Sequence, residues 1–451
     1  MKRFTAGWPR ASAIAILLAF AGIPFWPAAP TAGQEMKPGA HTMKPGAHQS
    51  PAAQPPAAKA HGMKPPGGHG MGGMPADRPG FEPATICKQC HEDIYRDWSQ
   101  SMHAHARKAW YFSHKVATER MGMACYNEKN TAIACDTCHE PAGIYPFGAV
   151  MNASPPALAA IEGVTCDVCH RITEVKATGE FAFGAQDTKL GPYSDAKSPY
   201  HKTARSALIE KSDFCVACHG QLNNMNGLSV CDTVRTWRES RYAAEGKTCQ
   251  TCHMPGATGP AATGPGAPAD APKDRPLRRH TFRGPHSDPS LLREAATLEQ
   301  NVAKAGDGGL QIRITVTNSG TGHDLPSGLP ERLITLKVHA RDRAGNVVWQ
   351  NWRDDVYRED RQAAFGLFGF GPQGGPLPPM GATRIDRLSL LPGASRKLDY
   401  RLPPKVGREV ATVEARLVYF AARPDGIEYF GVWGLPEIQP KPMAEAVTAL
   451  R

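Results

Sequence analysis

The C-terminal part of the chain alternates hydrophobic and polar residues with a period of two. The clearest runs are residues 310–316, 334–338, 398–402 and 413–419. This period predicts strands with one buried face. An Arg-Ala-Gly-Asn turn at residues 343–346, followed by Val-Val-Trp, predicts a hairpin. Together the runs predict an antiparallel β-sandwich of immunoglobulin-like type over residues 290–451.

Residues 81–289 lack this strand pattern. Apolar residues recur at near-helical spacing over residues 92–109, which predicts one helix there. A Pro-, Gly- and Ala-rich stretch at residues 254–273 predicts a long surface loop. The chain is therefore expected to be multidomain, with a mainly α or irregular domain followed by the β-sandwich.

Ten of the twelve cysteines fall in one motif, Cys-x-x-Cys-His, which occurs five times. A shuffled chain of this composition would contain about 0.01 copies. The motif residues are Cys87, Cys90 and His91; Cys135, Cys138 and His139; Cys166, Cys169 and His170; Cys215, Cys218 and His219; and Cys249, Cys252 and His253. Two thiols one helical turn apart can each bond a vinyl group of one porphyrin, and the adjacent histidine then reaches its iron. The motifs predict five covalent c-type haems.

Structural zinc is the alternative interpretation of these cysteines, because Cys-x-x-Cys pairs with a histidine also satisfy tetrahedral coordination. A zinc site gives no reason for a histidine directly after every second cysteine. Zinc modules of this kind are also mostly intracellular. The position of the histidines therefore favours haem.

The N-terminus predicts export. Lys2 and Arg3 precede an apolar run over residues 11–26, and small residues follow at 31–33. This pattern is typical of a signal peptide spanning residues 1–33. An uncleaved anchor is the alternative, but the run contains Pro24 and is shorter than a spanning helix. We expect the chain to be periplasmic, with the cell surface as the alternative, because c-type haem is attached outside the bacterial inner membrane.

Residues 34–80 are rich in Pro, Gly, Ala, Met and His. The hexapeptide Met-Lys-Pro-Gly-Ala-His occurs at residues 36–41 and again at 43–48. Such a segment cannot bury a core and is expected to be disordered. One hypothesis is that its thioether and imidazole groups bind copper. The alternative is a solvated spacer.

The formal charge of +10 does not by itself predict an acidic partner or nucleic acid. Each haem carries two propionates, so five haems would add about ten carboxylates. The loaded protein would then be near neutral, and no nucleic-acid partner is predicted.

Four segments resemble a known family. They are residues 87–103, 233–255, 280–286 and 322–328. They are similar to elements of multihaem cytochromes related to the tetrahaem cytochrome of ammonia oxidisers and to hydroxylamine oxidoreductase, including members that end in a β-sandwich. The resemblance covers about residues 81–436 and implies electron transfer through closely packed, largely bis-histidine haems. The chain has only five motifs and no Cys-x-x-Cys-Lys motif, so the resemblance supports an enzyme less well than an electron carrier.

The histidines outside the motifs and the tail are candidates for the second axial ligand of each iron. Five resemble distal ligands of this family: His103, His201, His280, His286 and His323. His105 and His114 are neither assigned nor rejected as ligands. His339 is rejected because it shares a strand face with Thr335 and Lys337, which is expected to meet solvent.

Two cysteines, Cys125 and Cys231, lie outside any motif. In an oxidising compartment two remaining thiols are expected to pair, so a disulfide is predicted between them, with two free thiols as the alternative.

Enough histidines are present to saturate every iron, so electron transfer is the favoured function. Its partners would be redox proteins, the donor and acceptor being unknown. Association with other multihaem cytochromes or with the outer membrane is a further expectation. The alternative is an oxidoreductase with one open haem that acts on a small nitrogen or sulfur compound. A structural or adhesive role of the β-sandwich is a third hypothesis.

Overall fold

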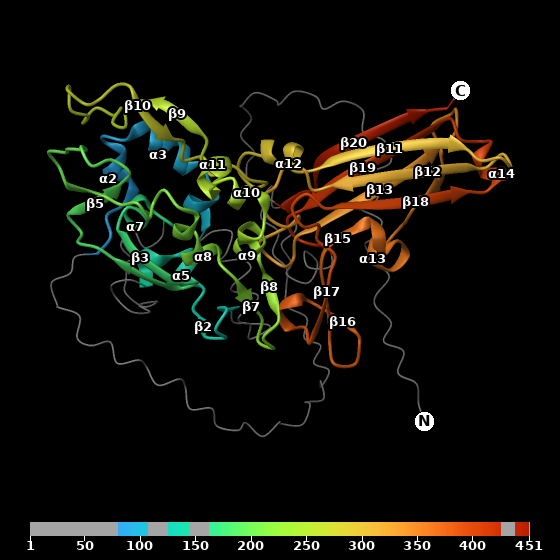
Figure 1. Cartoon of the computed structure of the whole chain (residues 1–451), viewed down its shortest axis with the longest axis horizontal. Helices are drawn as coiled ribbons and strands as arrows, with labels where there is room; N and C mark the ends of the chain where they lie inside the picture. The colour runs from blue at the N-terminus through green and yellow to red at the C-terminus, as the bar shows by residue number, and fades with distance from the viewer. Residues whose placement is uncertain (1–79, 107–124, 145–161, 425–437, 451) are drawn as a thin grey trace, which may run out of the picture. The chain divides into compact units, whose positions relative to one another are not determined.

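The computed structural model describes residues 80–106, 125–144, 162–424 and 438–450 (Figure 1). The predicted signal peptide, the tail segment for which copper binding is one hypothesis, and His114 lie outside the described residues. Asp77–Arg451 form one compact unit, which contains the predicted domain boundary at residues 289 and 290. Within the described ranges, no helix combines the length and the apolarity that a membrane span requires.

The C-terminal region consists of two antiparallel sheets. The smaller has the order β11 (Thr297–Lys304), β12 (Leu310–Thr317) and β18 (Ser395–Leu402). The larger has the order β16 (Pro376–Leu377), β15 (Ala364–Phe370), β13 (Leu333–Arg341), β19 (Thr412–Phe420) and β20 (Lys441–Ala449), with β14 (Val347–Gln350) on β13 and β17 (Arg384–Arg387) on β15. The short helices here are α12 (Ser290–Ala295), α13 (Val356–Glu359), η4 (Arg361–Ala363), η5 (Pro379–Gly381) and α14 (Pro404–Gly407). All four predicted strand runs and the predicted hairpin are confirmed.

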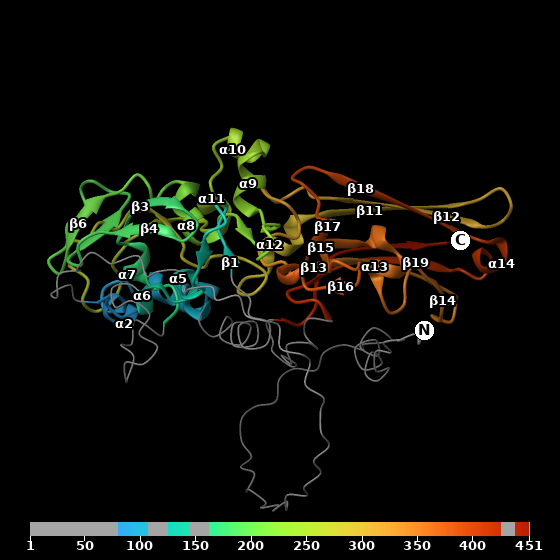
Figure 2. The same ribbon diagram turned by 90° about the horizontal axis from the view of Figure 1, so that it is seen from below.

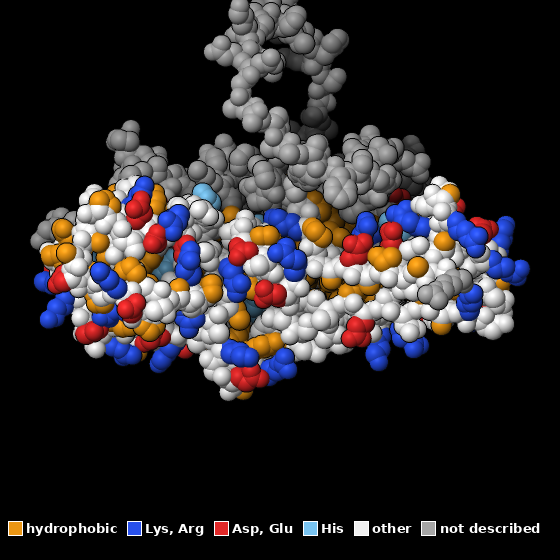
Figure 3. Space-filling model, turned by 90° about the horizontal axis from the view of Figure 1, so that it is seen from above, with side chains coloured by type: hydrophobic (Ala, Val, Ile, Leu, Met, Phe, Trp, Pro, Cys, Tyr) orange, Lys and Arg blue, Asp and Glu red, His pale blue; other side chains and the backbone are white. Residues whose placement is uncertain are grey.

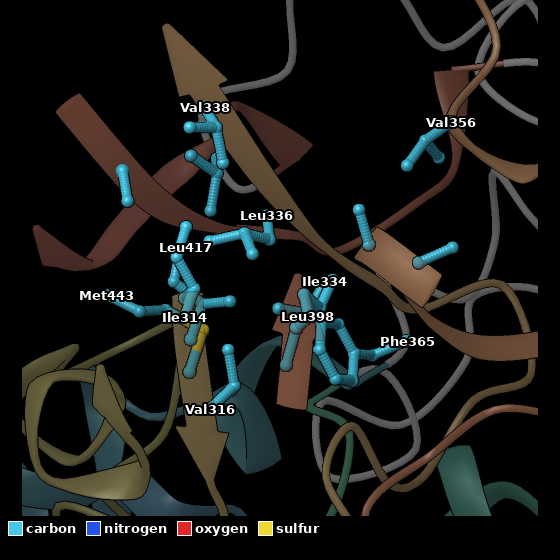
Figure 4. Close-up of a cluster of buried hydrophobic side chains, with 14 of the residues drawn as sticks. Ile314, Val316, Ile334, Leu336, Val338, Val356, Phe365, Leu398, Leu417 and Met443 are labelled. Atoms are coloured by element: carbon cyan, nitrogen blue, oxygen red, sulfur yellow. The ribbon is translucent and has the colours of Figure 1, made fainter. Parts of the chain in front are cut away.

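One hydrophobic cluster joins the two sheets, which form separate layers in Figure 2. Along β12 the side chains alternate, and Ile312 and Ile314 are fully buried. They contribute to the same cluster as Leu336 of β13 and Leu417 of β19 (Figure 4). Burying each such side chain contributes about 1.5–3 kcal/mol. The period of two in the sequence therefore reflects a core shared by both sheets.

The second face of β13 is buried too, which the sequence did not indicate. Thr335, Lys337 and His339 are 3, 8 and 7% exposed. The Lys337 ammonium donates to the carbonyl of Trp352 and lies 3.9 Å from the centre of that indole ring. The prediction that His339 meets solvent is therefore wrong, because the chain after β14 covers this face.

The N-terminal described region is built from single helical turns and short strands. Its helices are α2 (Ala84–Lys88), α3 (Glu92–Ser99), α5 (Asp136–His139), α6 (Pro141–Ile144), α7 (Cys166–Cys169), η3 (Ser212–Phe214), α8 (Val216–His219), α9 (Thr233–Arg238), α10 (Arg241–Ala244) and α11 (Cys249–His253). Its strands are β1 (Cys125–Tyr126), β2 (Ala132–Ile133), β3 (Ile172–Ala177), β4 (Glu180–Phe183), β5 (Thr188–Gly191), β6 (Lys202–Arg205), β7 (Leu222–Asn223), β8 (Ser229–Cys231), β9 (Gly256–Gly259) and β10 (Arg275–Arg278).

The helix predicted over residues 92–109 is interrupted. Helix α3 ends at Ser99, and a second helical segment begins at Met102. The hydroxyl of Ser99 donates to the carbonyl of Arg96 at 2.9 Å, which offers the backbone an alternative to the helical ladder. His91 and His103 therefore do not lie on one continuous helix.

The stretch at residues 254–273 is more ordered than the predicted surface loop. Its first part forms β9, which pairs with β10. The chain between these strands packs on the first Cys-x-x-Cys-His motif, where the N–H groups of Thr263 and Gly264 donate to the carbonyl of Cys90 at 2.8 and 3.1 Å. The prediction is corrected to a hairpin that covers this motif.

Hydrogen bonds tie the two regions together. Tyr242 in α10 donates its hydroxyl hydrogen to the carbonyl of Ser319 at 2.9 Å, and the Thr233 and Ser327 hydroxyls lie 2.6 Å apart. The residues at 319–327 therefore dock on α9 and α10.

We predict that Leu336→Ala lowers the free energy of unfolding by about 2–5 kcal/mol, because it removes a fully buried side chain from the shared cluster. Guanidinium unfolding followed by far-UV circular dichroism measures the change. The matched control is Val447→Thr on β20, since Val447 is 57% exposed and a surface change should cost less than about 0.5 kcal/mol. Equal effects of the two variants would contradict a core shared by the sheets.

Candidate haem-binding site

Each Cys-x-x-Cys-His motif forms one helical turn. In four of them the histidine N–H donates to the carbonyl of the first cysteine at 2.8–3.1 Å, and the fifth motif is helix α11 itself. Local polar side chains start two of these turns: Thr165 accepts a hydrogen bond from the Val168 N–H, and Thr248 and Thr251 form a capping box. The turn places both thiols and the imidazole on adjacent positions, as one tethered porphyrin requires.

The five motifs line one cavity of about 2730 Å³. Its lining includes all ten motif cysteines, all five motif histidines and all five predicted distal histidines. A drug-sized ligand occupies roughly 300–1,000 Å³, so this volume exceeds the need of one small ligand.

Three distal histidines lie opposite motif histidines. The pairs, with the distance between ring centroids and the angle between ring planes, are His170 with His280 (6.3 Å, 23°), His253 with His323 (6.4 Å, 10°) and His103 with His219 (6.0 Å, 79°). An iron that binds one nitrogen of each ring at about 2 Å separates the ring centres by roughly 6 Å. The spacing therefore suits one iron between the members of each pair.

Backbone carbonyls hold six of the ten histidines by Nδ1, at 2.6–3.0 Å. The acceptors are Ala261 for His91, Leu190 for His170, Arg283 for His253, Lys202 for His201, Arg278 for His280 and Asp324 for His323. A carbonyl can only accept, so Nδ1 carries the proton and Nε2 keeps its lone pair. These imidazoles are therefore fixed in the tautomer that binds a metal through Nε2.

Burial also keeps several of these imidazoles neutral. It lowers the pKa of His103 to about 3 and the pKa of His219 and of His280 to about 4. A metal binds the neutral imidazole, so these groups need not lose a proton at physiological pH.

The other candidate histidines differ in position. His286 lines the cavity edge-on to Tyr419, with 6.5 Å between ring centroids, and His201 lines it beside the exposed Tyr200. Which histidine completes the proposed site of His91, and which that of His139, therefore remains a prediction. His105 is described but does not belong to the lining.

Two positioning contacts had no recognised signal in the sequence, and the first is made by Asp97 of α3. Asp97 is 6% exposed and accepts hydrogen bonds from the Arg279 guanidinium at 2.5 and 2.6 Å and from the His280 N–H at 3.1 Å. Burial opposes ionisation of Asp97, but these hydrogen bonds lower its pKa. The charged Asp97 thus fixes the segment that carries His280.

The second contact is made by Gly163, which places the segment that carries His103. The Val164 N–H donates to the His103 carbonyl at 2.9 Å, and a Cβ on Gly163 would lie 2.5 Å from that oxygen. Gly163 also has a φ of +74°, which residues with side chains rarely adopt. Only glycine allows this approach.

The predicted disulfide between Cys125 and Cys231 is wrong for this structure, where both are free thiols. Strand β7 lies between β1, which carries Cys125, and β8, which carries Cys231. Strands two positions apart are separated by roughly 10 Å, whereas a disulfide needs Cα atoms within about 7 Å. Burial raises the pKa of Cys231, and a hydrogen bond with Cys135, followed by burial, raises that of Cys125.

Comparisons with known proteins find similarity to cytochromes. Residues 86–171 match the family model of cytochrome c554 and c-prime. The fold is similar to that of a penta-haem cytochrome c552 from Thermochromatium tepidum, with a TM-score of 0.66 and 24% identity, over 82% of this chain and 99% of that chain. The chain shares the fold of that cytochrome. No curated protein matches the sequence.

The residues present fit c-type haem better than zinc. Among the described residues, no group of three or more His, Cys, Asp or Glu side chains gathers as metal ligands would. Structural zinc needs four such ligands around one point. The structure instead has thiol pairs on helical turns and opposed imidazoles around a mainly apolar cavity, which is the arrangement that a tethered porphyrin requires.

We predict five covalent haems per chain when the protein is matured with the c-haem attachment machinery. Intact mass and a pyridine haemochrome assay measure the number, and conversion of one motif, as in Cys249→Ala with Cys252→Ala, should lower it by one. Four or fewer haems in the unaltered chain would contradict the prediction that each of the five motifs binds one haem.

We also predict that alkylation of the denatured protein without reductant labels both Cys125 and Cys231. The motif cysteines serve as the internal control, because thioether bonds to haem should block them. If both residues were labelled only after reduction, the result would instead support a disulfide between them.

Proposed function

We propose that this chain is an exported pentahaem c-type cytochrome that transfers electrons between redox proteins outside the cytoplasm. The observation that carries the proposal is the set of three opposed histidine pairs inside the cavity of the five motifs. Bound haem would supply an iron that accepts and releases one electron. The residues of this chain would tether the porphyrins and occupy both axial positions.

The ligand assignment follows the geometry where rings face each other. His103, His280 and His323 would complete the sites of His219, His170 and His253. His201 and His286 are proposed for the sites of His91 and His139. Saturated irons favour outer-sphere transfer, since neither redox state gains or loses a ligand.

The backbone hydrogen bonds support transfer over catalysis. Imidazoles that are pinned through Nδ1 keep their orientation in both redox states, so little rearrangement accompanies the change of charge. A fixed ligand also denies a small substrate access to the iron. The alternative function, an oxidoreductase acting on a small nitrogen or sulfur compound, needs at least one site without such a ligand.

The C-terminal sheets are proposed to form an immunoglobulin-like sandwich that completes one haem site. His323 belongs to the segment that docks on α9 and α10, and Asp324 of the same segment accepts a hydrogen bond from the buried Thr236 hydroxyl at 3.1 Å. Unfolding of the sheets should therefore disturb the site of His253.

Surface charge suggests how partners are recognised. Basic and acidic side chains are interspersed over the face drawn in Figure 3. We propose that a redox partner that binds this face does so through local charge pairs rather than through one large patch of a single sign.

We predict that His323→Ala opens one iron. Electron paramagnetic resonance of the oxidised variant should show a new high-spin ferric signal, and the reduced variant should bind about one equivalent of carbon monoxide, because water or carbon monoxide then takes the sixth position. The control is His105→Ala, which changes a histidine outside the cavity lining.

Stoichiometric carbon monoxide binding to the unaltered protein would instead favour the oxidoreductase. An unchanged spectrum in His323→Ala would remove His323 from the ligands.

A further inference from the structure

Phe282 lies against the imidazoles of two different sites. Its ring centroid is 4.2 Å from that of His103 and 5.9 Å from that of His280, and both contacts are edge-on, with interplanar angles of 84° and 89°. The side chain belongs to the cavity lining. None of the motifs accounts for an aromatic ring between two proposed ligands.

The backbone of Phe282 is strained. Its φ is +44°, a left-handed value that is rare for a bulky aromatic residue. Such strain persists only where the surroundings impose it, and it clusters at functional sites. Both neighbouring segments are pinned here: Asp97 holds the N–H of His280, and the N–H of Arg283 donates to the carbonyl of His253 at 3.0 Å. The fold therefore imposes a conformation that drives the ring of Phe282 toward His103.

The site beside Phe282 differs from the other two paired sites. The rings of His170 and His280, and those of His253 and His323, are within 23° of parallel, whereas those of His103 and His219 are 79° apart. The four near-parallel rings are all held by Nδ1 hydrogen bonds.

The perpendicular pair is held differently. In the described parts of the chain, no hydrogen-bond partner is found for the imidazole of His103, and its ring contacts are those with His219 and Phe282. Packing against Phe282 restrains rotation of this ring about its Cβ–Cγ bond.

We propose that Phe282 is a positioning residue that holds the His103 imidazole perpendicular to that of His219 and thereby makes this iron site electronically distinct from the near-parallel sites. The proposal rests on haem binding as proposed above.

Two iron d orbitals can interact with the π systems of the axial imidazoles. Parallel imidazoles both act on the same one of these two orbitals and therefore separate the two in energy. Perpendicular imidazoles act on one orbital each and leave the pair nearly degenerate. A low-spin ferric iron with parallel ligands gives a rhombic paramagnetic resonance signal, and one with perpendicular ligands gives an axial signal with a single large g value.

The test is electron paramagnetic resonance of the oxidised, fully loaded protein and three variants. The unaltered protein should show an axial low-spin signal with the intensity of at least one haem, besides rhombic signals. Phe282→Leu keeps an apolar side chain but removes the flat ring, so the axial signal should lose the intensity of about one haem and one further rhombic signal should replace it. Phe282→Tyr keeps the ring and should retain the axial signal.

The matched control is Phe181→Leu. Phe181 also lines the cavity, but its ring packs against Phe183, with 5.4 Å between the ring centroids. This variant should leave the axial signal unchanged, which separates ring orientation from general loosening of the cavity. The haem count of every variant is measured alongside, and Phe282→Met repeats the test if Phe282→Leu loses haem.

The outcomes separate this proposal from the proposed function. An axial signal that keeps its full intensity in Phe282→Leu, or that loses intensity equally in Phe181→Leu, overturns the role of Phe282 and leaves electron transfer intact. Absence of any axial low-spin signal in the unaltered protein also overturns it. A high-spin signal or stoichiometric carbon monoxide binding in the unaltered protein bears on the proposed function instead.

Discussion

Backbone carbonyls that accept the Nδ1 proton of a candidate ligand histidine are the constraint on which the region around the five motifs depends. For the motif histidines His170 and His253 these acceptors are carbonyls 20 and 30 residues further along the chain, those of Leu190 and Arg283. A region with little regular secondary structure can supply them, because its carbonyls are not all used in helices or sheets. The short strands and turns between the motifs thus have a structural role, since they bring backbone oxygens behind the ligands.

The C-terminal sheets contribute to the same positioning of ligands. Their core is built as in any antiparallel protein, from alternating side chains such as Ile312 and Ile314. The segment after β12 leaves the sheets, carries His323, and supplies its own acceptor, the carbonyl of Asp324. A stable sheet core therefore stiffens a ligand that would otherwise sit on a free loop, which joins the stability of the sheets to the geometry of the site.

Local patterns predicted local features well. The Cys-x-x-Cys-His turns, the alternating strands and the hairpin at residues 343–346 depend on neighbouring residues, and the sequence indicated each of them. The break after Ser99 and the burial of His339 depend on contacts that periodicity does not describe, so periodicity gave the wrong result for both. The predicted bond between Cys125 and Cys231 failed for a related reason, because counting thiols says nothing about the strand between them. The resemblance to known cytochromes named three candidate histidines that the structure places opposite motif histidines.

The contacts that no pattern indicated are those that set the angle of a ligand rather than its identity. Gly163 lets the backbone of His103 approach, Asp97 anchors the segment of His280, and Phe282 turns one ring edge-on to another. None of these residues carries a metal or a bond to haem, so motif spacing has no reason to mark them. Each acts through a contact between segments far apart in the sequence, or through a strained φ, and both become visible only in three dimensions. The five motif histidines are therefore marked by a local sequence pattern, whereas the orientation of the proposed ligands depends on contacts between segments far apart in the sequence.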